Sequence, residues 1–333
     1  MNFLTLAGGV GGAKLAEGLT RAVGAEQLAV IVNTADDFVL HGLHISPDID
    51  TVMYTLAGLA NPETGWGIAG DTWENFGMLE RYGASPWFRL GDRDLATHLL
   101  RTQLISEGAT LSEATNILAR RLGVTTRILP MSDDPVHTLV DTDKGALPFQ
   151  EYFVREHWQP VVRALLYEGS AEAEPAATML RRIETADTIV ICPSNPYLSI
   201  DPILSLRGVH DVLLNASAPI IAVTPIVAGE ALKGPAAKLM RELGVEASAV
   251  EVARHYSDFI NGFILDQRDA DLRPRIEAMG MGVLVTDTIM NNADDRARLA
   301  CEIVAFADEL RPEKLGGCLL DAGAAPGKTA PPA

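Results

Sequence analysis

A glycine-rich turn near the amino terminus places the tightest constraint on the fold. It follows a short apolar run, residues 3–6, and precedes a helical pattern. Its glycines are Gly8, Gly9, Gly11 and Gly12. Glycine permits backbone angles and close approaches that other residues resist, so such a cluster between a strand and a helix predicts a phosphate resting on bare amides at a helix N-terminus. The alternative is a plain tight turn.

Neither standard phosphate fingerprint is complete in this turn. A Walker A loop ends in Gly-Lys followed by Ser or Thr, but here Ala13 precedes Lys14 and Leu15 follows it. The dinucleotide pattern G-x-G-x-x-G fits Gly9 and Gly11 but has Lys14 in place of the third small residue. The turn therefore predicts phosphate or nucleotide binding without naming the ligand.

Composition limits the class of protein. The chain has 333 residues, of which 47% are hydrophobic, so it can bury a large core. Its formal net charge of -17 argues against nucleic-acid or membrane-surface partners, because both require a basic face. No apolar run reaches the roughly 18 residues of a membrane span, and the first residues lack the pattern of a secretion signal. We expect a cytoplasmic protein.

Apolar runs alternate with helical patterns and predict an α/β fold. Strand-like runs occupy residues 28–33, 188–194, 219–225 and 281–287. This alternation is typical of a Rossmann-like, mainly parallel sheet with helices on both faces. Ligands bind such sheets at the carboxyl ends of the strands, so the polar residues that follow each run should gather along one edge.

Residues 51–125 read differently, because they are helical by spacing and contain no strand-like run. We expect a helical insertion or cap over the edge of the sheet. The nucleotide-binding and metal-binding core is then formed by residues 1–50 and 126–312. Residues 313–333 are small and rich in Pro, Gly and Ala, which predicts a disordered tail.

Four carboxylates lie within fifteen residues of one another, shortly after the glycine turn. They are Asp36, Asp37, Asp48 and Asp50. Like charges this close repel one another unless a cation joins them, and oxygen-rich sites suit Mg²⁺. The alternative is that Asp48 or Asp50 caps a helix that begins near Thr51. His41 and His44 are more simply read as loop residues than as metal ligands, and residues 294–306 as a helix with a solvated charged face.

Seven motifs, in order along residues 2–308, resemble the 2-phospho-L-lactate transferase family of coenzyme F420 biosynthesis. They are LAGGVGGAKLAEGL, NTADDFVLHGLHISPDIDTVMYTLAG, NPETGWGIAGDTW, WFRLGDRDLATHLLRT, MSDDPVHT, PSNPYLSIDPIL and TPIVAGEALKGPAAK. The resemblance implies transfer of a phosphate-linked three-carbon acid from a guanosine diphosphate donor to the ribityl hydroxyl of the deazaflavin Fo. GMP leaves, Mg²⁺ assists, and the protein forms a homodimer.

The resemblance also implies roles for individual residues. The donor diphosphate and nucleotide would be bound by Gly8, Gly9, Gly11, Gly12, Lys14, Ser194 and Asn195. Asp36 and Asp48 would hold Mg²⁺, while Asp50 would orient or deprotonate the acceptor hydroxyl. The deazaflavin would be stacked on or clamped by Trp66, Trp87, Arg89 and Arg93. Core packing is the alternative for the two tryptophans, and a Pro-flanked turn for Ser194 and Asn195.

Two other functions stay open at this point. A sugar-nucleotide-binding regulatory protein of the same superfamily would share the glycine turn and the acidic residues but would lack a deazaflavin pocket. An NAD(P)-dependent oxidoreductase on a Rossmann-like sheet is the second alternative. Lys14 and the aspartate cluster argue against it, because hydride transfer requires neither.

Overall fold

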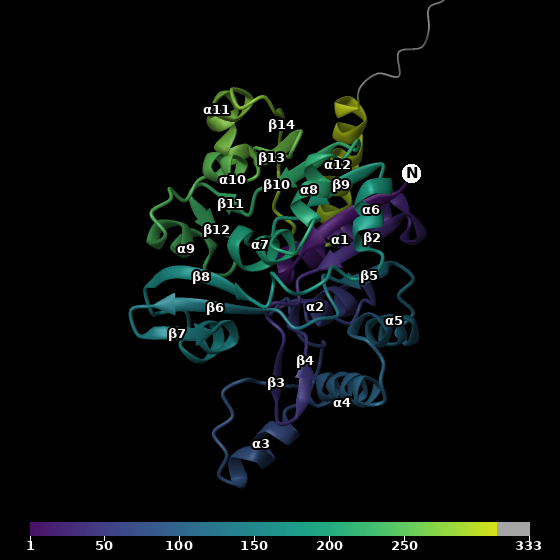
Figure 1. Ribbon diagram of the computed structural model, residues 1–333, viewed down its shortest axis with the longest axis vertical. Coiled ribbons are helices and arrows are strands. Elements are labelled where there is room, and N and C mark those ends of the chain that lie inside the picture. Colours follow the sequence, from purple (N-terminus) through teal and green to yellow (C-terminus); the bar gives the residue numbers. More distant parts are fainter. Residues whose placement is uncertain (312–333) are drawn as a thin grey trace, which may run out of the picture.

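A seven-stranded parallel sheet organises the molecule (Figure 1). The computed structural model describes residues 1–311, so the expected disordered tail lies outside the described residues. The strand order is β14-β13-β10-β9-β1-β2-β5. The strands are β1 (Phe3–Ala7), β2 (Leu28–Val32), β5 (Arg127–Pro130), β9 (Thr188–Ile191), β10 (Ile220–Val223), β13 (Gly262–Asp266) and β14 (Gly282–Thr286).

Helices cover both faces of this sheet. One core contains side chains of α1 (Gly9–Val23), α2 (Pro47–Leu56), α5 (Leu111–Arg121) and α12 (Ala293–Leu310). The other contains side chains of α6 (Met179–Thr185), α7 (Asp201–Leu204), α8 (Val209–Leu214), α9 (Ala236–Glu242), α10 (Ala249–His255) and α11 (Arg273–Glu277). Successive strand residues point to opposite faces, so Leu4 and Leu6 enter one core while Phe3 and Ala7 enter the other.

The predicted fold class is confirmed. The four predicted strands appear as β2, β9, β10 and β14, and the run before the glycine turn appears as β1. We did not predict β5 and β13. Their short apolar runs lie directly beside helical segments, where periodicity alone does not separate a strand from a helix.

Three smaller antiparallel units surround the main sheet. The largest consists of β6 (His137–Thr142), β7 (Gly145–Pro148) and β8 (Val162–Glu168). Two hairpins pair β3 (Phe38–Leu40) with β4 (Leu43–Ile45) and β11 (Ile226–Val227) with β12 (Glu230–Ala231). Short helical turns are η1 (Ala25–Gln27), η2 (Glu151–Arg155), η3 (Pro196–Ile200) and η4 (Gln267–Leu272).

The connection from β2 to β5 carries the helical insertion. It contains α2 and α5 and, between them, α3 (Glu74–Arg81) and α4 (Asp92–Ser106), and it contributes no strand to the seven-stranded sheet. α3 lies at the far end of the molecule in Figure 1, whereas α2 packs on α1 and joins the core of the sheet. The boundaries between core and cap stay a prediction.

Candidate functional site

The glycine turn and the loop after β9 meet where the strand order reverses. β1 pairs with β2 on one side and with β9 on the other, so the carboxyl ends of β1 and β9 border a crevice of the kind that binds ligands in open α/β sheets. The Gly8 amide donates to the Ser194 hydroxyl oxygen over 3.2 Å, and that hydroxyl donates to the Gly8 carbonyl over 2.8 Å. This reciprocal pair joins the two loops.

Gly11 and Gly9 of this turn are glycines for different structural reasons. A Cβ on Gly11 would lie 2.3 Å from the Pro193 carbonyl oxygen, so Gly11 is required by packing of α1 against the loop after β9. Gly9 has a φ of +62°, and the nearest atom to a Cβ there would be Asp48 Oδ1 at 3.9 Å. The open face of the turn is therefore at Gly9, where the first amides of α1 have no helical partners. Its role as a phosphate cradle stays a prediction.

Basic side chains lie near the start of α1. Lys14 donates to the Met290 carbonyl over 2.7 Å. Burial lowers the pKa of Lys14, and the nearby charges of Arg296 and Lys233 lower it further. Lys233 in turn donates to the Thr64 carbonyl. Positive charges brought this close favour an anion at this end of the helix.

Sequence reasoning missed two of these cations. Lys233 lies in the TPIVAGEALKGPAAK motif, which follows a strand end, and this position was the available signal. Arg296 lies in the segment predicted to be a solvated helix face. That prediction is wrong for Arg296, because its side chain is mostly buried and lies 3.4 Å from Glu17.

Asp36 and Asp48 form the part of the acidic cluster that has no cation partner among the described residues. Asp48 accepts from the Gly9 amide over 2.8 Å and from Asn33 Nδ2 over 3.1 Å. Asp36 is buried, and its Oδ1 has no hydrogen-bond partner within residues 1–311. Burial, followed by the charges of Asp48 and Asp37, raises the pKa of Asp36 well above its usual range. Burial raises the pKa of Asp48 to about 6.

These two carboxylates fit a divalent cation. Unpaired buried carboxylates are costly, and an ion bound between them would offset the burial that raises both pKa values and the charge repulsion that raises the pKa of Asp36 further. Oxygen ligands of this type suit Mg²⁺. Because Asp48 also accepts from the Gly9 amide, an ion held here would lie beside the glycine turn.

Asp50 lies in a different environment from Asp48. The helix predicted to begin near Thr51 begins at Pro47, with Ser46 at the N-cap, so the prediction that Asp48 or Asp50 caps this helix is wrong. Both lie in its first turn. Asp50 forms a two-pronged ion pair with Arg101 of α4, whose side chain is completely buried.

The ion pair belongs to a buried polar network. His98 Nδ1 lies 3.6 Å from Asp50, and His98 Nε2 lies 3.3 Å from Asp94. The Tyr54 hydroxyl donates to Asp94 over 2.7 Å. Asp50, Asp94 and His98 are close enough to one another to hold a metal ion, but the Arg101 guanidinium already supplies the cation to Asp50. This arrangement favours an orienting role for Asp50, and its role as a base stays a prediction.

Asp37 has partners on one of its two carboxylate oxygens, from the β3–β4 hairpin region, while its Oδ1 is buried without a hydrogen-bond partner within residues 1–311 and burial raises its pKa. The Ser46 hydroxyl donates to Asp37 Oδ2 over 2.6 Å, and His44 Nε2 lies 3.2 Å from the same oxygen. His41 occupies the hairpin turn with a φ of +53°. His44 therefore contacts the acidic cluster, whereas His41 forms part of the hairpin turn.

Asn195 is used locally. Its Oδ1 accepts from the amides of Tyr197 and Leu198, which caps η3, as the predicted Pro-flanked turn requires. Its Nδ2 is buried and has no hydrogen-bond partner among residues 1–311. The nucleotide-binding role of Ser194 and Asn195 stays a prediction.

The two tryptophans predicted to bind the acceptor have different neighbours in the structure. Trp66 is 45% exposed, in a loop whose Gly65 lies against Val10 of the glycine turn. Trp87 is half-buried and packs against Phe38 and Phe88, with ring centroids 6.0 and 5.7 Å away.

The two arginines contact the cap itself. Arg89 lies over the ring of Trp73 at 4.4 Å, and Arg93 donates to the Ala69 carbonyl over 3.3 Å. Trp66 is therefore the more exposed of the two predicted tryptophans, and its loop lies against the glycine turn.

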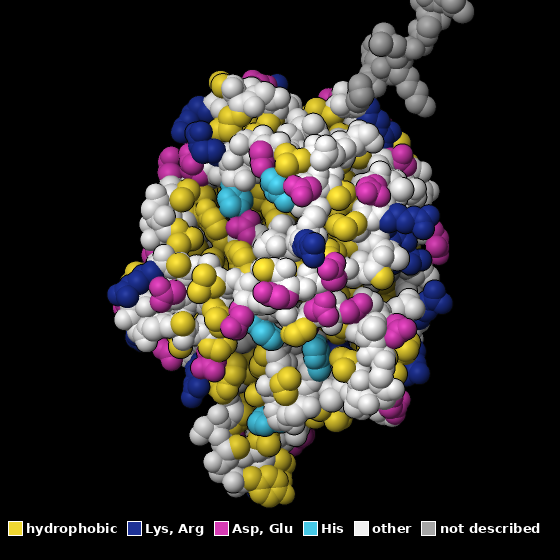
Figure 2. Space-filling view, viewed as in Figure 1, with side chains coloured by type: hydrophobic (Ala, Val, Ile, Leu, Met, Phe, Trp, Pro, Cys, Tyr) yellow, Lys and Arg dark blue, Asp and Glu magenta, His cyan; other side chains and the backbone are white. Residues whose placement is uncertain are grey.

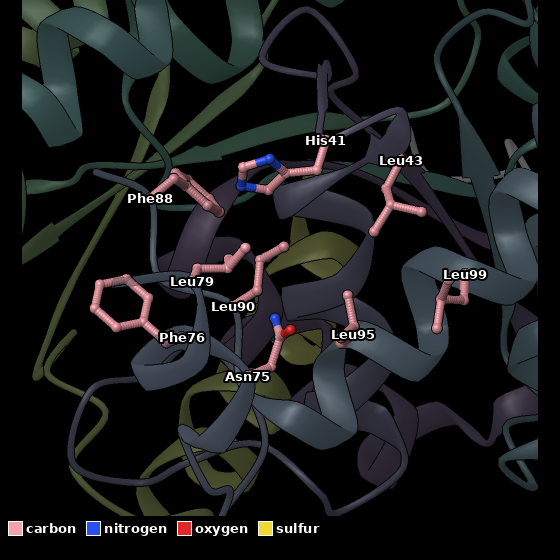
Figure 3. Close-up of a pocket in the computed structure, with 9 residues that line it drawn as sticks. All are labelled: His41, Leu43, Asn75, Phe76, Leu79, Phe88, Leu90, Leu95 and Leu99. Atoms are coloured by element: carbon pink, nitrogen blue, oxygen red, sulfur yellow. The ribbon is translucent and has the colours of Figure 1, made fainter. Parts of the chain in front are cut away.

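The cap also contains an apolar cavity of about 250 Å³ (Figure 3). It lies among the β3–β4 hairpin, α3 and α4. Its lining residues are His41, Leu43, Asn75, Phe76, Leu79, Phe88, Leu90, Leu95 and Leu99. Sequence reasoning missed this cavity, and none of the predicted acceptor residues lines it.

Comparison with known proteins identifies the family. Residues 4–304 match the family model for 2-phospho-L-lactate transferase CofD. The chain belongs to this family. It is 41% identical to a phosphoenolpyruvate transferase of Kitasatospora aureofaciens over 93% of this chain and 99% of that protein. It is 39% identical to a 2-phospho-L-lactate transferase of Methanosarcina acetivorans over 92% of this chain and 99% of that protein.

The fold also resembles a solved structure. A upf0052 family protein from Bacillus halodurans superimposes with a TM-score of 0.60 at 15% identity, covering 91% of this chain and 98% of that one. The predicted family, the α/β fold and the assignment to the transferases are confirmed. The NAD(P)-dependent oxidoreductase alternative is wrong, and the full-length transferase relatives favour an enzyme over a regulatory protein. Within residues 1–311, no helix combines the length and apolar character needed to cross a membrane.

Substituting Gly11 tests the packing at the strand reversal. Gly11→Ala is expected to lower the free energy of unfolding by about 1 to 3 kcal/mol, because the new methyl group overlaps the Pro193 carbonyl. Gly77→Ala in α3 is the matched control, since a Cβ there meets no atom within 4 Å and alanine should stabilise the helix by about 0.5 to 1 kcal/mol. Chemical denaturation measures both, and equal stability of the two variants would contradict this account of Gly11.

Asp36→Asn tests the unpaired carboxylates. The raised pKa values of Asp36 and Asp48 mean that the folded protein holds protons that the unfolded chain releases. Their contribution to stability is therefore greatest below the ordinary aspartate pKa of about 4 and is lost as the pH rises through the raised pKa values, which for Asp48 is about 6. Without metal at pH 7.5, Asp36→Asn should therefore unfold at a higher temperature than the wild type. Added Mg²⁺ should stabilise the wild type and have no such effect on Asp36→Asn.

The exposed Asp271→Asn is the control for this comparison and should behave as the wild type does. If Mg²⁺ stabilises Asp36→Asn as strongly as the wild type, Asp36 is not a ligand.

Proposed function

We propose that this protein transfers a phosphate-linked three-carbon acid from a guanosine diphosphate donor to the ribityl hydroxyl of Fo and releases GMP. The observation that carries the proposal is that Asp48 accepts from the Gly9 amide at the reversal of strand order, while neither Asp48 nor the nearby Asp36 has a basic partner within residues 1–311. Family membership supplies the type of reaction. Phosphoryl-type transfer needs in-line positioning and neutralised charge, and this crevice offers groups for both.

The donor diphosphate would lie on the first amides of α1. Lys14 and Lys233 would neutralise part of its charge, which is consistent with the lowered pKa of Lys14. Ser194 and Asn195, at the end of β9, would line the nucleotide side of the crevice. The Asn195 Nδ2 group offers one unused donor there.

Asp36 and Asp48 would hold Mg²⁺. When bound, the ion would supply charge neutralisation at the phosphate oxygens. Asp48 also accepts from the Gly9 amide, so its carboxylate fixes the glycine turn relative to the metal ligands.

The acceptor would bind between the glycine turn and the cap. Asp50, held in place by Arg101, would orient the attacking hydroxyl. Trp66 presents an exposed ring in the loop that lies against the glycine turn, and Trp87, Arg89 and Arg93 lie on other segments of the cap. The flat deazaflavin has aromatic faces of the kind that such rings stack on.

The acid on the donor and the oligomeric state remain separate proposals. The relatives named above transfer different acids by name, phosphoenolpyruvate in one case and 2-phospho-L-lactate in the other, at nearly equal identity. We expect a homodimer, which light scattering would measure.

The decisive experiment is to incubate the protein with Fo, Mg²⁺ and guanosine diphosphate esters of lactate, enolpyruvate or glycerate in turn, and to read product masses. The expected result is one dominant phosphodiester of Fo and the acid, together with GMP. Asp36→Asn should reduce turnover more than tenfold, on the order of 2 kcal/mol, whereas Asp271→Asn should not. If none of the donors leads to modified Fo, the proposal is overturned.

Two tryptophan variants separate acceptor binding from packing. Trp66→Ala should weaken Fo binding by roughly 1 to 3 kcal/mol, the scale of a lost aromatic stack, with little change in unfolding temperature because the ring is exposed. Trp87→Ala should lower the unfolding temperature, because its ring packs on Phe38 and Phe88. Fluorescence titration with Fo and thermal unfolding measure the two effects. If Trp66→Ala binds Fo as the wild type does, the acceptor lies elsewhere in the cap.

A further inference from the structure

An arginine-lined cavity lies at the amino ends of the strands, opposite the acidic site at their carboxyl ends. Its volume is about 450 Å³, and it is bordered by the end of α5, the turn into β5 and the residues that precede β2. These segments lie at the amino ends of β2 and β5, whereas the acidic residues follow the carboxyl end of β2. A five-residue strand spans roughly 17 Å, so the cavity is remote from the proposed metal site.

Three arginines line this cavity and none of them has an acidic partner. They are Arg120 of α5, Arg127 of β5 and Arg182 of α6. Within residues 1–311 no ion pair involves them, although acidic residues exceed basic ones by 17 in this chain. The Arg182 Nε is buried and has no hydrogen-bond partner among those residues. The one acidic residue of the lining, Glu26, is exposed and forms no ion pair in the same part of the chain.

The positive charges of neighbouring arginines repel one another at this cavity. Burial lowers the pKa of Arg182, and the neighbouring charges of Arg127 and Arg181 lower it further. Such repulsion persists only where no anion compensates it. In Figure 2, Lys and Arg side chains gather at the edge of the molecule where Figure 1 places α6 and β5.

The floor of the cavity is apolar. Leu28, Val124 and Ile128 line it and are almost completely buried. Asn116 and Thr125 add polar groups that are exposed to solvent. The cavity therefore combines a charged rim with an apolar base, the usual composition of a small-molecule site.

We propose that this cavity binds a small organic phosphate monoester. The phosphate would be held by the guanidinium groups of Arg120, Arg127 and Arg182, whose planar donor pairs match phosphate oxygens. The carbon body would rest on Leu28, Val124 and Ile128. A cavity of about 450 Å³ is larger than a lone phosphate requires and lies in the range of small-molecule sites.

Calorimetric titration with glycerol 2-phosphate, in EDTA without Mg²⁺, tests the proposal. The wild type is compared with the double variant Arg127→Gln, Arg182→Gln. Arg163→Gln is the matched control, because Arg163 is an exposed arginine of β8 that forms no ion pair within residues 1–311. We expect saturable binding that is at least tenfold weaker in the double variant and unchanged in the control. Because phosphate can also bind at the glycine turn, the difference between variants locates the site.

Other outcomes would overturn the proposal. Equal affinity in the wild type and the double variant would place the binding elsewhere. Succinate binding as tightly as glycerol 2-phosphate would overturn the phosphate class, and equally tight binding of inorganic phosphate would overturn the role of the apolar floor.

Thermal unfolding without ligand checks that the double variant folds. Its unfolding temperature should equal or exceed that of the wild type, because two repelling charges are removed. A clear decrease would show that the arginines serve to stabilise the fold and not to bind a ligand, and it would overturn the proposal.

Discussion

The buried ion pair between Asp50 and Arg101 is the interaction on which the acidic site depends. The first turn of α2 brings Asp48 and Asp50 into the protein close to Asp36 and Asp37, and burying four carboxylates together would be prohibitive without compensation. Arg101 neutralises Asp50 from α4. Breaking such a buried pair typically costs about 3 to 5 kcal/mol, so α4 and α2 are held in one relative position.

This pairing decides which carboxylates remain available. Asp37 Oδ2 accepts from Ser46 and lies beside His44, and Asp50 is paired with Arg101, so within residues 1–311 Asp36 and Asp48 are the members of the cluster without a basic partner. Burial without a basic partner raises the pKa of both, and the charges of Asp48 and Asp37 raise that of Asp36 further. A protein that binds no cation here would be more stable with neutral residues at these positions. Retained repulsion at a strand end, beside a helix N-terminus, is therefore an argument for a bound cation and its anionic ligand.

Local patterns in the sequence predicted the parts of this arrangement that depend on neighbouring residues. Apolar runs located β2, β9, β10 and β14, and the glycine cluster located the turn before α1. The contacts that join distant segments could not be predicted in the same way. Nothing near Asp50 indicates that Arg101, fifty-one residues later, is its partner. Likewise, the approach of Pro193 to Gly11 depends on the pairing of β1 with β9, which the order of residues does not reveal.

The amino ends and the carboxyl ends of the parallel strands form two opposite edges of the sheet, and these edges carry unpaired charges of opposite sign. At the carboxyl edge the uncompensated groups are Asp36 and Asp48, and an anionic substrate can approach them only with a cation between. At the amino edge the uncompensated groups are Arg120, Arg127 and Arg182, which form no ion pair within residues 1–311, and an anion can bind there directly. β2 connects the two edges, since residues before it border the arginine cavity and Asn33, immediately after it, donates to Asp48. A ligand that repositions the start of β2 would therefore act on the strand that leads to Asn33, the donor to Asp48, with no contact of its own to the metal ligands.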